Sequence, residues 1–239
     1  MPPPNSRLQL RGRLTRGAGW LVGIVASLFV IYLFGGASVK AAVDHWLVLT
    51  PYSAFHDGHL WKLATSAVIY PARDFFGFLI DGLMLFTFVP VLERWWGTRR
   101  FIIFVIATSL IGNLAAAMIG YAISPYVYIY GLTPFIYASI VAFGVLFSDQ
   151  MVSFFGVVPI KGRSLAIGAA ALMALMVLLD RQWVRGAGAF AAMGLAYVMT
   201  TGSFTPNLWW LRFKRWRVRR KLGVLEGGRK KPDKQKWVN

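Results

Sequence analysis

Six long apolar segments, separated by polar connections, constrain this chain more than any other feature of its sequence. An α-helix needs about 20 apolar residues to cross the ~30 Å hydrocarbon core of a bilayer, and the segments approach or meet that length. With 57% hydrophobic and 15% charged residues in 239, the chain also carries more apolar surface than one soluble core hides. The sequence therefore predicts an all-α, polytopic membrane protein. The predicted spans are Trp20–Gly36, Phe75–Leu92, Phe101–Ile123, Gly131–Phe147, Leu165–Leu179 and Val184–Thr201.

Basic residues are concentrated at the two ends of the chain and in its second and fourth connections. The formal net charge is +17, from 26 Lys and Arg against 9 Asp and Glu. Cytoplasmic segments of membrane proteins carry the excess of Lys and Arg, so the pattern indicates membrane orientation more than nucleic-acid binding. We expect no nucleic-acid partner and two cytoplasmic termini. The predicted parts are a basic N-terminus at 1–19, a six-helix membrane domain at 20–201 and a basic tail at 202–239.

The tail contains a stretch, Leu208–Leu225, in which aromatic residues alternate with cations. Such a stretch can form a basic amphipathic helix on anionic lipid, where each cation near the surface contributes about 1 kcal/mol. It can equally be a flexible positive-inside stop signal, and both readings stay open. The predicted lipid-binding residues are Arg212, Lys214, Arg215, Arg217, Arg219, Arg220 and Lys221. The short spans and compact loops favour a bacterial inner membrane.

Small residues recur at four-residue spacing in three of the predicted spans. This spacing places them on one helix face, where they allow neighbouring helices to approach closely. We therefore expect these spans to be tightly packed. The three stripes are Gly112, Ala116 and Gly120; Ala166, Ala170 and Ala174; and Gly188, Ala192 and Ala196.

Cysteine and histidine are too scarce to support most metal or nucleophile chemistry. The chain has no cysteine, which excludes disulfides and thiolate ligands, and its three histidines lie at 45, 56 and 59 in the first long connection. His56 and His59 could bind a metal weakly, but nothing else supplies a matched ligand set. We expect no metal site and no cofactor.

Several stretches, taken in order, resemble the rhomboid superfamily of intramembrane serine proteases across about residues 20–201. His59–Ser66 is similar to the Glu-Leu-Trp-Arg-Leu-Leu-Thr-Ser stretch that closes the family's first outer loop. Leu92–Phe101 is similar to the family's Leu-Glu-x-x-x-Gly-[Ser/Thr]-x-[Arg/Lys]-Phe connection. Phe155–Ile160 resembles the loop before its fifth span. The resemblance implies a six-helix bundle with a water-filled cavity that opens to the outside.

The catalytic residues of that family are not carried over. Its fourth span begins Gly-x-Ser-Gly, whereas here the same place reads Gly131-Leu132-Thr133-Pro134. The family's sixth-span histidine aligns with Arg185, whose guanidinium cannot accept a proton. The His and Asn that support the oxyanion align with Gly77 and Asp81. We therefore expect no catalytic residue at these four degenerate positions.

Each of these positions also has a purely structural reading. Asp81 is a functional candidate because an ionised carboxylate in a span is costly, but a protonated or Arg-paired Asp81 could simply hold helices together. Arg185 could extend its side chain to the headgroups, and Thr133 could serve packing alone.

Three functional classes follow from the sequence. The first is an inactive rhomboid-like protein that binds the transmembrane helices of client proteins. The second is an active intramembrane protease with Thr133 as an atypical nucleophile. The third is a transporter or channel, which would call for more intramembrane charges and for internal repeats.

Overall fold

The computed structural model describes residues 15–154 and 158–202. These lie in the first of two compact units, Met1–Ser203, and the second unit is Phe204–Asn239. The predicted lipid-binding tail residues therefore lie outside the described residues. So do most of the basic N-terminus and part of the Phe155–Ile160 motif.

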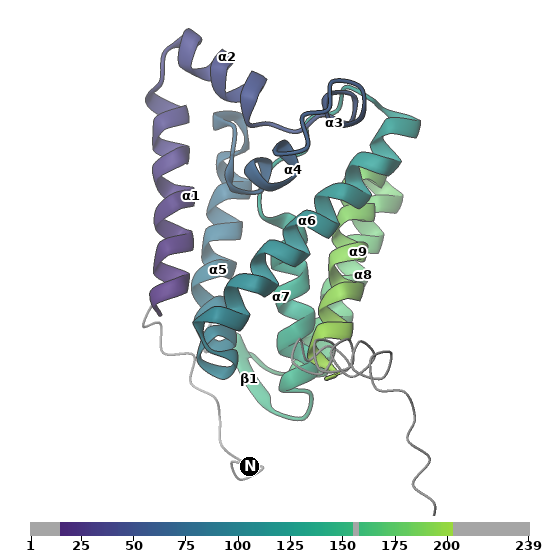
Figure 1. Ribbon diagram of the computed structural model, residues 1–239. Helices are drawn as coiled ribbons and strands as arrows, with labels where there is room; N and C mark the ends of the chain where they lie inside the picture. The colour runs from purple at the N-terminus through teal and green to yellow at the C-terminus, as the bar shows by residue number, and fades with distance from the viewer. Residues whose placement is uncertain (1–14, 155–157, 203–239) are drawn as a thin grey trace, which may run out of the picture. The chain divides into compact units, whose positions relative to one another are not determined.

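Six long helices occupy the places predicted for the six spans (Figure 1). The all-α polytopic fold is confirmed. The largest difference in the spans is at the first helix, which begins at Arg16 instead of Trp20 and ends at Phe34 instead of Gly36. The fourth helix begins two residues later than predicted, at Thr133, and ends one residue early. The helices are α1 Arg16–Phe34, α5 Phe75–Trp96, α6 Thr98–Ile123, α7 Thr133–Leu146, α8 Gly162–Asp180 and α9 Trp183–Thr200.

Four helices of the described chain are long and apolar enough to cross a membrane by length and composition. They are α1, α5 with its 3-10 turn, α6 and α8. Helix α7 is shorter, with 14 residues, and α9 is rich in Gly and Ala. Both pack closely inside the bundle, α7 against α8 and α9, and α9 against α6. Much of the surface of α7 and α9 is therefore covered by other helices, whereas the outer helices would expose more of their surface to lipid.

The first connection is a folded cap at one end of the bundle. Its elements are α2 Ala37–Trp46, α3 Pro51–Phe55, α4 Lys62–Thr65, η1 Ser66–Val68 and η2 Ala72–Asp74. Thr50 and Ser53 form a capping box at the start of α3, which satisfies backbone N–H groups there. Leu49 forms an isolated β-bridge with Ile129, so the cap is tied to the connection before α7.

A β-hairpin between α7 and α8 was not predicted from the sequence. Strands β1 Met151–Phe154 and β2 Val158–Lys161 pair antiparallel, with Met151 opposite Lys161. The strand sequences are rich in β-branched and other apolar residues, which favour extended backbone. Each strand has only four residues, so its sequence cannot be distinguished from that of an apolar loop.

Small residues make the predicted close contacts. A Cβ on Gly188 of α9 would lie 2.9 Å from the carbonyl oxygen of Gly112 and 3.2 Å from the Cβ of Ala116 on α6. A Cβ on Gly144 of α7 would lie closer still to the Cβ of Ala166 on α8. The backbones of these helices therefore meet with almost no side chain between them, as small-residue stripes permit.

Glu93 joins α5 to the start of α1. Its buried carboxylate accepts hydrogen bonds from the N–H of Gly17 at 2.9 Å, the N–H of Ala18 at 2.8 Å and the hydroxyl of Thr98 at 2.8 Å. The hydroxyl of Thr15 also donates to it. Glu93 thus caps the N–H groups that the first turn of a helix leaves unpaired.

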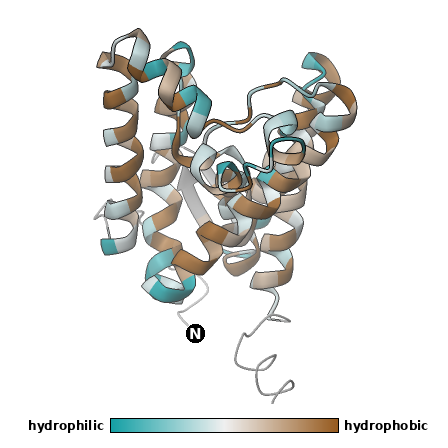
Figure 2. Cartoon of the chain, turned by 45° about the horizontal axis from the view of Figure 1, so that its top comes forward, coloured by the Kyte–Doolittle hydropathy of each residue, from teal (hydrophilic) through white to brown (hydrophobic). Residues whose placement is uncertain are grey.

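Charge divides the two ends of the bundle. Hydrophobic residues cover the helices along most of their length, and hydrophilic residues gather at the ends (Figure 2). The end where α1, α6 and α8 begin holds six described cations and two acids, whereas the opposite end holds five cations and five acids. The positive-inside rule therefore predicts that the first end is the cytoplasmic one. Its described cations are Arg16, Arg94, Arg99, Arg100, Lys161 and Arg163.

Candidate functional site

Helix α7 begins well inside the bundle, and this creates the candidate site. Fourteen residues at about 1.5 Å each span only about 21 Å of a ~30 Å core. Pro134 lies in the first turn, where its missing N–H costs nothing and its fixed φ favours helix initiation. The connection at 124–132 must therefore descend from the non-cytoplasmic end to reach Thr133.

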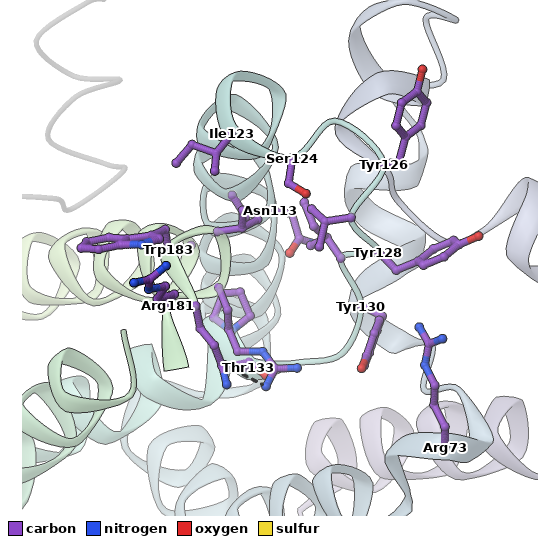
Figure 3. A pocket seen from close by; sticks show the side chains of 18 residues that line it. Arg73, Asn113, Ile123, Ser124, Tyr126, Tyr128, Tyr130, Thr133, Arg181 and Trp183 are labelled. Atoms are coloured by element: carbon purple, nitrogen blue, oxygen red, sulfur yellow. Dashed lines mark hydrogen bonds between the residues drawn. The ribbon is translucent and has the colours of Figure 1, made fainter. Parts of the chain in front are cut away.

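A cavity of about 660 Å³ lies along this descending connection (Figure 3). Its walls are the last part of α6, the connection itself, the first residues of α7, and the turn between α8 and α9. Arg73 of η2 completes the lining from the opposite side. The resemblance implied a cavity at this end of the bundle, and the described residues form one.

Tyr70 anchors the point where the connection enters α7. Its hydroxyl accepts a hydrogen bond from the N–H of Leu132 at 2.7 Å and donates one to Oδ2 of Asp81 at 2.7 Å. Burial, with a further contribution from Asp81, raises the pKa of the Tyr70 phenol, so the phenol keeps the proton that it donates. Gly131 adopts φ 82° against the Tyr70 ring, where a Cβ would lie 3.0 Å from a ring carbon. Only glycine fits this turn without strain.

The four degenerate catalytic positions have different locations. Thr133 and Arg185 both line the cavity, although they are far apart in the sequence. Asp81 lies behind it, half-buried and bonded to Tyr70. Gly77 packs against Asp74 in the first turn of α5 and does not belong to the described lining. The alignment to the rhomboid pattern therefore brings together the nucleophile and base positions, but not both oxyanion positions.

Asn113 of α6 is a site residue that sequence reasoning missed. It is 1% exposed and lines the cavity. Its Nδ2 donates to the carbonyl of Leu63 at 2.8 Å and to Oγ of Ser66 at 3.2 Å, whereas its Oδ1 has no partner among the described residues. An amide in the middle of an apolar span is a recognisable signal, because polar groups there are costly unless they are used.

Two further cations of the site were also missed. Arg73 lies over the rings of Tyr128 and Tyr130, with its guanidinium carbon 5.5 and 6.0 Å from their centroids. Arg181 ends α8 at φ 53°, and it is the only non-glycine residue of the described chain in the left-handed region. That conformation costs a residue with a Cβ roughly 1–2 kcal/mol, and such strain concentrates at functional sites.

Arg185, the third cation, faces the cavity and is exposed to it. Its hydrogen-bond partner is an uncharged amide, because the guanidinium donates to Oε1 of Gln182 at 3.4 Å. Within the described residues no carboxylate oxygen lies within 4.0 Å of it. Arg185 thus forms part of the cavity wall, and the interpretation that its side chain extends to the headgroups stays a prediction.

The chemistry available in this cavity is recognition more than bond cleavage. A threonine hydroxyl needs a base to become a nucleophile, and the guanidinium of Arg185 is always protonated. Pro134 also removes a backbone N–H next to Thr133 that could hold an oxyanion. The cations and the unpaired amide oxygen are, in contrast, well suited to binding a polar ligand.

The three histidines lie in the cap and line no part of this cavity as described. His56 stacks on Tyr52 and contacts Oδ1 of Asp57 at 3.2 Å, and His59 packs beside Trp61. Among the described residues, no group of three or more His, Cys, Asp or Glu side chains could hold a metal ion. The prediction that the chain needs no metal or cofactor stays a prediction.

The fold and the site define a class, an integral membrane protein whose helices form a cavity at the end of the bundle that carries the cap. The chain belongs to the family described as Eukaryotic integral membrane protein (DUF1751), whose model matches residues 22–216. No curated protein matches the chain significantly. The family's description as eukaryotic fits poorly with the bacterial inner membrane favoured by the sequence, and only the membrane location stands.

Proposed function

We propose that this protein is a catalytically inactive, rhomboid-like membrane protein that binds transmembrane helices of client proteins. Three features support this function: the order of the six helices, the rhomboid-like motifs at His59–Ser66 and Leu92–Phe101, and the cavity above α7. The rhomboid resemblance implies a cavity that opens to the outside, and the cavity above α7 is consistent with it.

One observation carries the proposal of inactivity. Thr133 and Arg185 line the same cavity, so the positions of nucleophile and base are occupied by a hindered hydroxyl and a permanent cation. Removing single members of a catalytic unit typically lowers the rate by about 10⁴–10⁶, and here both members are altered.

Client helices would bind through the side of the bundle. Helices α5 and α8 both pack on α7, and each leaves an apolar face exposed. On α5 this face includes Phe76 and Ile80, which are 77% and 56% exposed. A client helix can pack on such a face through van der Waals contacts and through polar groups that reach the cavity.

The test combines an activity assay with crosslinking. Purified protein in lipid is treated with a fluorophosphonate probe and with a helix-destabilised transmembrane substrate, beside an authentic rhomboid as positive control. We expect no labelling and no cleavage, either by the native protein or by Thr133→Ala. A photo-crosslinker at position 76 or 80 should capture discrete membrane partners, whereas one at Met118 of α6 should capture only background.

Labelling that disappears in Thr133→Ala would establish the alternative, an active protease with a threonine nucleophile. Equal crosslinking from all three positions would remove the support for client binding through α5.

We also propose that both termini are cytoplasmic and that the tail stretch 208–225 binds anionic lipid. Because the chain has no cysteine, single cysteines report its orientation cleanly. Thr98→Cys and Arg163→Cys, both at exposed positions, should be protected from an impermeant outside reagent, whereas Asp57→Cys and Gln182→Cys should react. A 208–225 peptide should bind vesicles that contain phosphatidylserine and leave them as salt is raised.

A further inference from the structure

Several cations lie at the end of the bundle that carries the cap, and membrane orientation alone does not explain them. The positive-inside rule keeps Lys and Arg away from the non-cytoplasmic end. Five lie there in the described chain, and three of the five line the cavity above α7. The three are Arg73, Arg181 and Arg185.

These cations are not balanced by acids within the cavity. No carboxylate belongs to the described lining. Of the nearest acids, Asp81 accepts from Tyr70 and interacts electrostatically with Arg185, Asp74 packs against Gly77, and Asp180 is exposed beside Nε2 of Gln182 at 3.4 Å. The cavity therefore presents an excess of positive charge to whatever enters it.

A second, independent feature points to a ligand with a hydrogen-bond donor. Oδ1 of Asn113 is buried in the cavity wall and has no partner among the described residues. Both N–H groups of the same amide are used, by Leu63 and Ser66, which settles which atom is the oxygen. A buried acceptor left in this state calls for a donor such as a hydroxyl.

We infer that this cavity binds a phosphate group carried by a molecule with a free hydroxyl, that is, phosphoglycerol chemistry. Guanidinium groups pair with phosphate oxygens through two parallel hydrogen bonds, and a doubly charged phosphate can engage more than one of them. The hydroxyl would donate to Oδ1 of Asn113. The volume of about 660 Å³ suits such a group, because ligand cavities commonly measure about 300–1,000 Å³.

Two sources can deliver this chemistry, and the experiment separates them. One is a soluble glycerol phosphate that enters from the aqueous side. The other is the headgroup of phosphatidylglycerol in the adjacent leaflet, with Tyr126 and Tyr128 at the mouth, 71% and 48% exposed, against the glycerol. The inference stands apart from client binding, since it concerns the cavity lining and not the side of the bundle.

The experiment uses the full-length protein in phosphatidylcholine nanodiscs. Glycerol 1-phosphate is titrated by calorimetry, with glycerol as the uncharged control. In a second arm, native mass spectrometry counts the phosphatidylglycerol retained from mixed-lipid nanodiscs. The double variant Arg73→Gln/Arg185→Gln removes two cavity cations, and Arg99→Gln removes an exposed cation at the cytoplasmic end. Size-exclusion profiles and unfolding temperatures check that all variants are folded.

We expect saturable binding of glycerol 1-phosphate, retention of phosphatidylglycerol, or both. The double variant should weaken binding about 100-fold, from about tenfold for each lost guanidinium, and Arg99→Gln should not change it. Binding in the first arm identifies a soluble ligand, and retention in the second arm alone identifies the lipid. The inference is overturned if neither probe binds, if glycerol binds as well, or if the double variant and Arg99→Gln behave alike.

Discussion

Glu93 and Asp81 are two carboxylates on the same helix, α5, and they differ in how completely they are bonded. Glu93, near the cytoplasmic end, accepts hydrogen bonds from four donors on α1 and at the α5–α6 turn. Asp81, toward the other end, accepts one from Tyr70 within the described residues. The carboxylate at one end of the helix thus joins three helices, whereas the carboxylate at the other end can accept further hydrogen bonds.

The same contrast extends to the surroundings of each residue. Around Glu93 the N–H groups of the α1 terminus are paired. Asp81 interacts electrostatically with Arg185, and the cavity that Arg185 lines contains an unpaired Asn113 oxygen, a left-handed Arg181 and three cations with no acid in the described lining. Unpaired polar atoms, strained backbone and unbalanced charges all lower stability. They are therefore expected mainly where a protein has a function.

The largest expected effect comes from Glu93→Ala. The change leaves buried donors on Gly17 and Ala18 without partners, and each such group costs about 1–3 kcal/mol. We expect a loss of at least about 3 kcal/mol in the free energy of unfolding, measured by thermal or denaturant unfolding in detergent. Glu93→Gln keeps one acceptor oxygen and should lose clearly less. A Glu93→Ala protein as stable as the native one would show that the cap is incidental.

Gly188→Val should come next. A Cβ at this position meets the α6 backbone at 2.9 Å, and overpacking of this kind costs about 1–3 kcal/mol. Gly194→Val is the matched control on the same helix, because a Cβ there meets nothing within 4 Å. The difference between the unfolding temperatures of the two variants reports how much the close contact between α6 and α9 contributes to stability. If the two variants were equally stable, the close approach would carry no weight.

Tyr70→Phe tests the less satisfied end. The ring still packs against Gly131, but the N–H of Leu132 and the carboxylate of Asp81 lose their shared partner. We expect a loss of at least about 1 kcal/mol in the free energy of unfolding, because a buried N–H group is left without its partner. Amide hydrogen exchange at Leu132 should become faster. Tyr126→Phe, which removes an exposed hydroxyl, is the control, and faster exchange in that variant too would argue against a specific anchor.

Thr133→Ala should have the smallest effect. The Thr133 hydroxyl has no hydrogen-bond partner among the described side chains, so its loss should change the free energy of unfolding by less than about 0.5 kcal/mol. Thr108→Ala is the informative comparison, because that buried hydroxyl donates to the carbonyl of Phe104 at 2.7 Å. A larger loss at Thr133 than at Thr108 would reveal a bond that the described structure does not contain.

The sequence by itself determined the six helices and the small-residue faces on which they pack, and its charges predict their orientation. Hydropathy, charge and four-residue spacing are local patterns, readable within one helix and its flanks. The sequence also placed Thr133 and Arg185 at related positions, through their rhomboid-like surroundings.

Only the tertiary structure decided what those positions adjoin. Tyr70 and Leu132 are 62 residues apart, and Glu93 and Gly17 are 76 apart, so no local pattern could reveal either bond. The depth at which α7 begins depends on how the connection before it folds against Tyr70. That depth opens the cavity, and helix packing then brings Arg73, Asn113 and Arg181 to its wall, because side chains from separate helices meet only after the bundle has formed.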